Sequence, residues 1–296
     1  MAADHIFTPE LAKPYPGTVG TAIVRVFDSV GGVVGWTEEN LKRLHPNVPF
    51  KTVTITGNNH ASYFPGAVPM LIKLVWNSET TRILGAQVVG SDGVDKRVDV
   101  LATAIMAGMN VDDLCHLELA YAPPFTSARD PVNVAAFAAQ NIQNQLLKPT
   151  YAIPSASSDS PLILDVRAKD LPRDATFSGK VIPLDELRDR LDELDVKKPI
   201  VTVCALGKSS YFASRILNMN GYDAKSLIGG MHMAHSAVSP QNVSVTPASS
   251  AAAIVTGPPA PSSLPKEEIL VDACGLACPV SCLTFEVVAV LLLWLN

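Results

Sequence analysis

The stretch 199–221, PIVTVCALGKSSYFASRILNMNG, decides the fold of the second half of the chain. Its opening run, 199–204, is apolar and predicts a buried strand that ends in Cys204. A short loop follows, and the pattern of 210–221 then predicts a helix that Gly221 closes. The sequence therefore places one thiol between the carboxyl end of a strand and the amino end of a helix.

The residues around this stretch alternate between short apolar strands and helices. Strands are expected at 161–167, 199–204 and 224–230, and helices at 184–194 and 210–221. Such alternation predicts an α/β domain, with a parallel sheet covered by helices on both faces. We assign this domain to residues 151–236.

The first half of the chain has a different order of predicted elements, in which strands precede helices. Strands are expected at 18–28 and 50–56 and as a hairpin of 69–76 with 82–90; helices are expected after Thr37, over 94–109 and after the Asp130–Pro131 pair. Thr and Asp are good N-caps, and Pro suits the first helical position. We predict an α+β domain over residues 1–150.

Composition limits the classes of function. The chain has 296 residues, 48% hydrophobic and 17% charged, with a formal net charge of -5. This balance offers no basic surface to nucleic acid. The apolar end, 287–296, is shorter than the about 20 residues that a membrane helix needs. With five cysteines and no signal-peptide pattern, we expect a cytoplasmic protein.

The position of Cys204 suits sulfur chemistry. Backbone N–H groups in a strand–helix loop form a cradle for anions, and the helix dipole adds positive charge. Gly207 permits a tight turn, Lys208 supplies a cation, and Ser209 and Ser210 can donate hydrogen bonds. The alternative is a buried structural cysteine, which is common at strand ends. Spacing alone does not favour either interpretation over the other.

Residues 161–235 resemble a rhodanese domain. The strand LILDVR carries the signature Asp165-Val-Arg167, and C-x-x-G and LIGGM follow in the family order. The resemblance implies that Cys204 accepts sulfur and that the next five residues cradle a persulfide: Ala205, Leu206, Gly207, Lys208 and Ser209. The family usually has Arg where this chain has Ser209, so we expect thiosulfate to be a poor donor.

The first domain resembles the dimerisation domain of flavin-dependent pyridine-nucleotide disulfide oxidoreductases, in the branch of coenzyme A-disulfide reductases and NADH oxidases. The stretches that carry the resemblance are YPGTVGTAIVRVFD (15–28), NNHASYFPGAVPMLIKL (58–74) and YAPPFTSARDPVNVAA (121–136). It implies a homodimer in which Tyr63 and Tyr121 face the partner's flavin and thiol substrate. Packing in the dimer interface is the alternative role for both tyrosines.

Cofactors and metals are not expected on this chain. FAD and NAD(P)H belong to the full-length family, whose flavin and nicotinamide domains would lie upstream, and no G-x-G-x-x-G loop occurs here. Cys115 does not match a redox position of that family. We predict that it is buried and structural, and that His116 beside it binds no metal.

The end of the chain divides into two predicted segments. Residues 237–266 are rich in Ser, Pro and Ala and are expected to be a disordered linker. Residues 267–296 resemble the truncated start of a TusA-like sulfur carrier, in which VDACGLACPVSC makes Cys278 the sulfur-carrying thiol and Cys274 a second candidate. Zinc is the alternative, but Cys274, Cys278 and Cys282 lack a fourth ligand nearby.

Together these segments predict sulfur transfer through a persulfide on Cys204, with a small thiol or sulfane-sulfur donor as partner. The intact loop after Cys204 favours this function. Ser209 favours the alternative, a non-catalytic dimerising fragment of a coenzyme A-disulfide or persulfide reductase.

Overall fold

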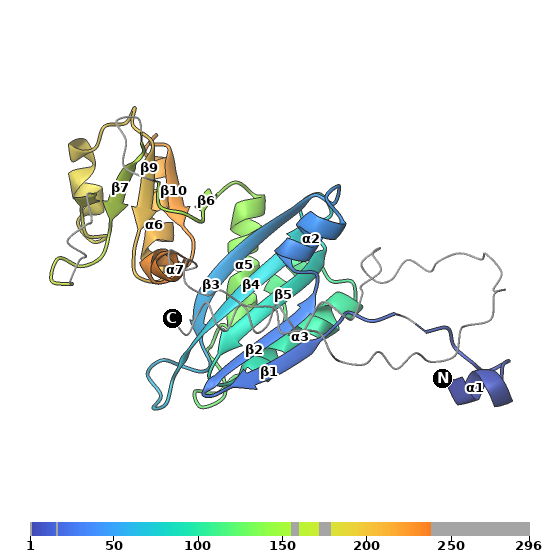
Figure 1. The fold of residues 1–296 in the computed structure, drawn as a ribbon. Helices are drawn as coiled ribbons and strands as arrows, with labels where there is room; N and C mark the ends of the chain where they lie inside the picture. Colours follow the sequence, from blue (N-terminus) through green and yellow to red (C-terminus); the bar gives the residue numbers. More distant parts are fainter. Residues whose placement is uncertain (1, 16, 155–159, 172–178, 238–296) are drawn as a thin grey trace, which may run out of the picture.

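The structure is a computed structural model that describes residues 2–15, 17–154, 160–171 and 179–237. It contains two five-stranded sheets, one in each predicted domain (Figure 1). Most of the predicted linker and the whole TusA-like segment, with Cys274 and Cys278, lie outside the described residues. Within the described ranges, no helix is long and apolar enough to cross a membrane.

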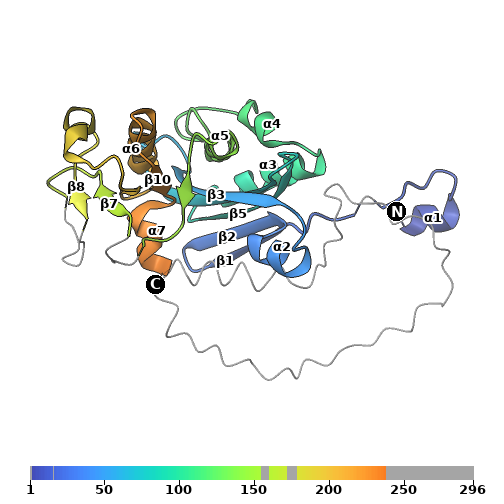
Figure 2. The same cartoon turned by 90° about the horizontal axis from the view of Figure 1, so that it is seen from above.

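The first sheet is antiparallel and has the order β1-β2-β5-β4-β3. Its strands are β1 (Ala22–Val26), β2 (Ser29–Gly35), β3 (Phe50–Asn58), β4 (Pro69–Asn77) and β5 (Ile83–Gly90). The helices α3 (Val94–Met106) and α5 (Pro131–Gln143) lie on one face, and α2 (Glu38–Leu44) lies on the other, as Figure 2 shows. The apolar stripes of α3 and α5 bury the main core against the sheet.

The local signals of the first domain are confirmed. Thr37 caps α2, because its side chain accepts the N–H of Asn40 at 3.2 Å. Asp130 caps α5, where its carboxylate accepts the N–H of Val132 at 3.0 Å and Pro131 is the first helical residue. The strand expected over 18–28 is shorter, and the glycine-rich β2, which no pattern predicted, runs beside it.

The second sheet is parallel and has the order β6-β10-β9-β7-β8, which confirms the predicted α/β class. Its strands are β6 (Pro149–Thr150), β7 (Leu162–Asp165), β8 (Lys180–Val181), β9 (Ile200–Val203) and β10 (Ala224–Leu227). Side chains alternate along β9, so that Ile200 packs with α6 (Lys208–Met219) on one face. Val201 and Val203 pack with α7 (Gly230–Ala237) on the other.

The segment predicted as a helix over 184–194 is instead a 3₁₀ helix, η1 (Leu187–Glu193), with a non-helical residue at Arg190. The Arg190 guanidinium holds Glu186 at 2.7 Å and Glu193 at 2.5 Å. Short 3₁₀ segments are common connectors, and the charged sequence has too narrow an apolar stripe to anchor a full α-helix.

The two domains are joined through packed residues. β6, the last two residues of the segment predicted as the first domain, forms the edge of the second sheet, and Ser226 on β10 donates its N–H to the carbonyl of Lys148 at 2.9 Å. The Tyr151 hydroxyl donates to the carbonyl of Thr52 at 2.5 Å, and Ile228 packs into the core of the first domain. The chain also forms two short helices, α1 (Ala2–Phe7) and α4 (Val111–Cys115).

Candidate functional site

Cys204 directly follows β9, and its side chain faces α6. Only 4% of the residue is exposed. The N–H of Gly207 donates to the Cys204 Sγ at 3.1 Å. Gly207 is the N-cap of α6 and has a φ of 93°, a conformation that suits glycine. The predicted turn therefore aims a backbone donor at the sulfur, beside the positive end of a helix dipole.

A second contact to the sulfur comes from inside the domain. The Ser210 Oγ lies 3.5 Å from the Cys204 Sγ and 3.0 Å from the carbonyl oxygen of Gly207. The Ser226 hydroxyl donates to the Ser210 Oγ at 3.1 Å. The sequence predicts Ser210 as a hydrogen-bond donor of this loop, whereas Ser226 was not foreseen. The doubled serine after Lys208 was a signal, but strand β10 had to be placed before Ser226 could be found beside it.

The loop after Cys204 is fixed by the start of α7. Met231 donates its N–H to the carbonyl of Cys204 at 2.8 Å, and His232 donates to the carbonyl of Ala205 at 3.1 Å. A Cβ on Gly230 would lie 2.4 Å from the Ala205 carbonyl oxygen. The second glycine of LIGGM, Gly230, is therefore needed for the close approach of α7 to this loop.

The five predicted cradle residues surround the turn, with different exposures. Ala205, Leu206 and Lys208 are exposed, whereas Gly207 and Ser209 are half-buried. Lys208 is the first residue of α6 and Ser209 the second. The outer surface of the loop thus offers one ammonium group and two apolar side chains.

The predicted signature pair, Asp165 and Arg167, is a bidentate ion pair. Asp165 is fully buried, and its carboxylate accepts from the Arg167 Nη2 at 2.8 Å and from the Arg167 Nε at 3.1 Å. The hydrogen bond to Asp165 raises the pKa of Arg167 against the effect of burial, and the charges of Asp165 and Cys204 raise it further. A permanent cation therefore lies close enough to interact with a charged Cys204.

Cys115 lies in α4 and packs into the core of the first domain. Burial raises the pKa of its thiol to about 11, and the nearby charge of Asp112 adds to the shift. A neutral thiol in a core fits the predicted structural role. Within the described ranges, no cluster of His, Cys, Asp or Glu is arranged to hold a metal ion.

Tyr63 and Tyr121 lie together, although 58 residues separate them. Their hydroxyl oxygens are 3.0 Å apart, and the residues are 74% and 49% exposed. The hydrogen bond with Tyr121 raises the pKa of Tyr63. Phe125, on the same connection as Tyr121, is also exposed. The structure brings the two predicted residues into one exposed aromatic surface.

A buried arginine holds the two loops that carry these tyrosines. Arg97 on α3 donates to the carbonyl of Asn59 at 2.7 Å, to Thr126 at 3.0 Å and to Asp130 at 2.9 Å. Arg97 is 1% exposed and forms an ion pair with Asp130. Both partners make further hydrogen bonds, Arg97 to Asn59 and Thr126, and Asp130 to the N–H of Val132. The sequence pattern predicts Asp130 only as a helix cap, because nothing in it shows that Arg97 points inward.

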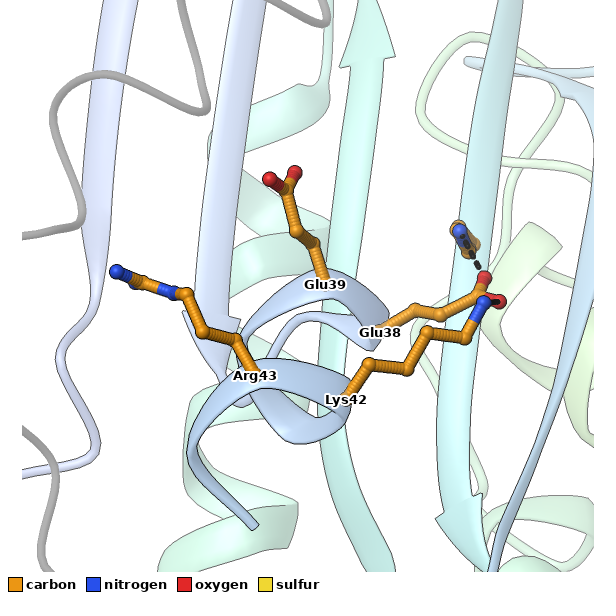
Figure 3. A pocket seen from close by; sticks show the side chains of 5 residues that line it. Glu38, Glu39, Lys42 and Arg43 are labelled. Carbon is orange, nitrogen blue, oxygen red and sulfur yellow. Dashed lines mark hydrogen bonds and ion pairs between the residues drawn. The ribbon is translucent and has the colours of Figure 1, made fainter. Parts of the chain in front are cut away.

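A hollow of about 420 Å³ lies beside α2, away from every predicted site residue (Figure 3). Its lining is charged: Glu38, Glu39, Lys42, Arg43 and Lys73. Glu38 binds Lys42 and Lys73, each at 2.6 Å. Burial raises the pKa of Glu38, but these two hydrogen bonds outweigh it, and the pKa falls below its usual value. Glu38, Lys42 and Lys73 satisfy one another, and none of the predicted site residues lines this hollow, so it is not a candidate site.

Known proteins resemble the chain over one domain or both. Residues 21–132 match the family of the pyridine nucleotide-disulphide oxidoreductase dimerisation domain. A coenzyme A disulfide reductase of Staphylococcus aureus (strain bovine RF122 / ET3-1) is 36% identical over 126 residues, which are 43% of this chain and 28% of that protein.

Two solved structures extend the similarity into the second domain. The reduced Bacillus anthracis CoADR-RHD is 43% identical, with a TM-score of 0.71, over 76% of this chain and 41% of that one. A NAD-dependent persulfide reductase from A. fulgidus is 40% identical, with a TM-score of 0.67, over 73% of this chain and 40% of that one. The chain thus spans less than half the length of these relatives.

The resemblance of residues 267–296 to a sulfur carrier lies outside the family match and outside the described residues, and it stays a prediction. The antiparallel sheet of the first domain agrees with the family match, and the parallel sheet of the second carries the Cys-x-x-Gly turn. The chain therefore comprises a dimerisation domain of the pyridine nucleotide-disulphide oxidoreductase type followed by a rhodanese-like α/β domain.

Proposed function

We propose that the chain transfers sulfane sulfur through a persulfide on Cys204. The observation that carries the proposal is the hydrogen bond from the Gly207 N–H to the Cys204 Sγ, at the amino end of α6. Such a donor and the helix dipole stabilise negative charge on sulfur, and the thiolate is the nucleophilic form of cysteine. A cysteine with only a packing role needs no donor aimed at its sulfur.

The chemistry has two steps. In the first, the Cys204 thiolate attacks the outer sulfur of a hydropersulfide RS–SH; a new S–S bond forms, the old one breaks, and RS⁻ leaves with the electron pair. In the second, an acceptor thiolate attacks the outer sulfur of the Cys204 persulfide, and the Cys204 thiolate leaves. Each step exchanges one S–S bond for another, so neither needs an external oxidant or reductant.

The donor class follows from the loop. A small hydropersulfide suits the exposed Ala205 and Leu206, which offer apolar contact, whereas thiosulfate needs more positive charge than Lys208 alone supplies. The names of the relatives support this choice, because one is a disulfide reductase of coenzyme A and another is a persulfide reductase.

Self-association is a second candidate function, without catalysis. It is favoured by the family match of the first domain and by the exposed surface of Tyr63, Tyr121 and Phe125. Exposed aromatic groups of this kind are typical of interfaces. We propose a homodimer through this surface, which is compatible with sulfur transfer at Cys204.

The family relatives imply dinucleotide cofactors, and the described residues do not fit them. No strand–helix turn in the described ranges has the Gly-x-Gly-x-x-Gly pattern for a pyrophosphate. The Gly207 turn directs its N–H to the Cys204 Sγ instead. No step of the proposed transfer therefore runs through a flavin or a nicotinamide.

Formation of thiocyanate from cyanide and a low-molecular-weight hydropersulfide tests the proposal. The full chain should accelerate this reaction, and Cys204→Ser should remove the acceleration. The control Cys115→Ser should retain it, because that thiol is buried in the first domain. A Cys204→Ser variant as active as the wild-type chain would show that the proposal is wrong.

A further inference from the structure

Three buried hydroxyl groups lie beneath Cys204. Thr202, Ser210 and Ser226 are each 0% exposed, and they come from β9, α6 and β10. A hydroxyl without a hydrogen bond is costly to bury, so every one of them should have a partner. Their partners form one connected network that ends at the Cys204 sulfur.

The network fixes the position of the Ser210 hydroxyl. Thr202 donates from its side chain to the carbonyl of Ser210 at 2.8 Å, which anchors the first turn of α6 to β9. The Ser226 hydroxyl donates to the Ser210 Oγ at 3.1 Å. These contacts leave the Ser210 Oγ 3.5 Å from the Cys204 Sγ, on the buried side of the sulfur.

We infer that Ser210 is a positioning residue for sulfur transfer, whose hydroxyl donates to the Cys204 Sγ whenever that sulfur is negatively charged. The inference rests on the proposed function for its consequence, although the contact itself is independent of it. It adds a side-chain donor to the backbone donor of Gly207, and both act on the same sulfur atom.

The hydrogen bonds can rearrange without moving a heavy atom. In the thiol form, the Cys204 S–H donates to the Ser210 Oγ, and the Ser210 O–H donates to the carbonyl of Gly207 at 3.0 Å. A thiolate has no proton to donate. The Ser210 O–H then rotates toward the sulfur, since a hydroxyl proton turns to suit its acceptor. The carbonyl of Gly207 keeps the N–H of Tyr211 at 3.3 Å.

Ser210 should matter most when sulfur is delivered to the acceptor. In that step the acceptor thiolate attacks the outer sulfur, the S–S bond breaks, and the electron pair goes to the Cys204 Sγ. Negative charge therefore develops at the atom that Gly207 and Ser210 contact. A donor already in place stabilises such charge without reorganisation.

The charged and titratable groups around the sulfur are unchanged by substitutions at Ser210. Arg167 after β7 interacts with charge on Cys204 and is paired with Asp165, and the elements that pack against the loop carry Lys208 on α6 and His232 on α7. A change in the pH profile of Cys204 in such variants therefore reports the hydroxyl. The chain also offers a matched control, because Ser214 lies one turn further along α6, is equally buried, and donates to the carbonyl of Tyr211 at 2.8 Å.

The test compares full-length Ser210→Ala with Ser214→Ala, after circular dichroism has shown native folds. Transfer from preloaded protein to cyanide should be about tenfold slower in Ser210→Ala, and Ser210→Thr should restore much of the rate. The midpoint of the pH profile for alkylation of Cys204 by iodoacetamide should rise by about one unit. Ser214→Ala should match the wild-type chain in both measurements.

Ser226→Ala gives a second route to the same inference if Ser210→Ala does not fold. It leaves Ser210 in place and should change both measurements in the same direction, by a smaller factor. If loaded wild-type protein and the folded serine variants have the same transfer rate and the same alkylation profile, the role of Ser210 is wrong. The proposed function at Cys204 would not be affected by that result. A wild-type chain that takes up no sulfur would instead contradict the proposed function, and the alkylation profile would still test the contact.

Discussion

The backbone N–H of Gly207 donates to the Sγ of Cys204 at 3.1 Å, across a turn of three residues. The turn depends on glycine in two ways, because Gly207 has a φ of 93° and a Cβ there would lie 3.1 Å from the Gly229 nitrogen. The first contribution is conformational freedom, and the second is close packing against the start of α7.

Gly207→Ala should separate sulfur transfer from stability. Strain in the left-handed region should lower the free energy of unfolding by about 1–2 kcal/mol. The displaced turn should also remove most of the transfer activity. Gly221→Ala is the control, because Gly221 has a φ of 84° with no atom within 4 Å of its added Cβ. Urea denaturation should show a loss of stability in both variants, with the larger loss in Gly207→Ala because of its close packing, while only Gly207→Ala loses activity. Equal activities would show that the turn geometry does not matter.

Ser209→Arg should raise activity with thiosulfate. Ser209 is half-buried, beside the exposed Lys208 at the start of α6. A guanidinium binds an oxyanion through two parallel hydrogen bonds, and we expect a gain of about tenfold in kcat/KM. Ser209→Lys adds the same charge without the fork and should give a smaller gain. If lysine matches arginine, charge alone limits the reaction, and the geometric argument is wrong.

Cys115 should resist alkylation at pH values at which Cys204 reacts. Burial and Asp112 raise the pKa of Cys115 to about 11, so the thiol stays protonated near neutral pH and reacts faster only as the pH approaches that value. Peptide mapping after iodoacetamide treatment at pH 8 measures the labelled fraction of each cysteine. Rapid labelling of Cys115 in the folded chain would contradict this assignment.

Phe125→Glu should weaken self-association. Phe125 is exposed four residues after Tyr121, on the same connection, and a charge buried there on dimerisation would be unpaired. Phe27→Glu is the control, because Phe27 is also highly exposed but lies at the turn between β1 and β2. Light scattering at micromolar concentration should show a dimer for the wild-type chain and for Phe27→Glu, and a monomer for Phe125→Glu. A monomeric wild-type chain would overturn the proposed surface.

Local chemistry explains which parts of the fold were predictable. Thr37 and Asp130 act through neighbours three residues away or fewer, so their caps follow from sequence. β2 was missed because its glycines give no apolar pattern. A Cβ on Gly32 would lie 2.4 Å from the side chain of Val98 on α3. Glycine is therefore required in β2 by the packing of a helix that is distant in sequence.

The contacts of the candidate site also fall into two groups, those within one loop and those between distant segments. Cys204, Gly207 and Lys208 lie within one loop, and their arrangement follows from the strand–loop–helix pattern. Ser226 reaches Ser210 only because β10 pairs with β9, and Arg97 reaches Asn59 only through the packing of α3. Such contacts between distant segments need the tertiary structure and cannot be derived from periodicity.

Sulfur transfer through a persulfide on Cys204 can be tested by measuring the mass of the peptide that carries this residue. The wild-type chain is treated with a low-molecular-weight hydropersulfide, freed of excess donor, and digested without reductant. We expect the Cys204 peptide to gain the mass of one sulfur atom and to lose it when cyanide is added. A Cys204 peptide of unchanged mass, in folded protein exposed to excess donor, would contradict sulfur transfer and leave self-association as the function of the chain.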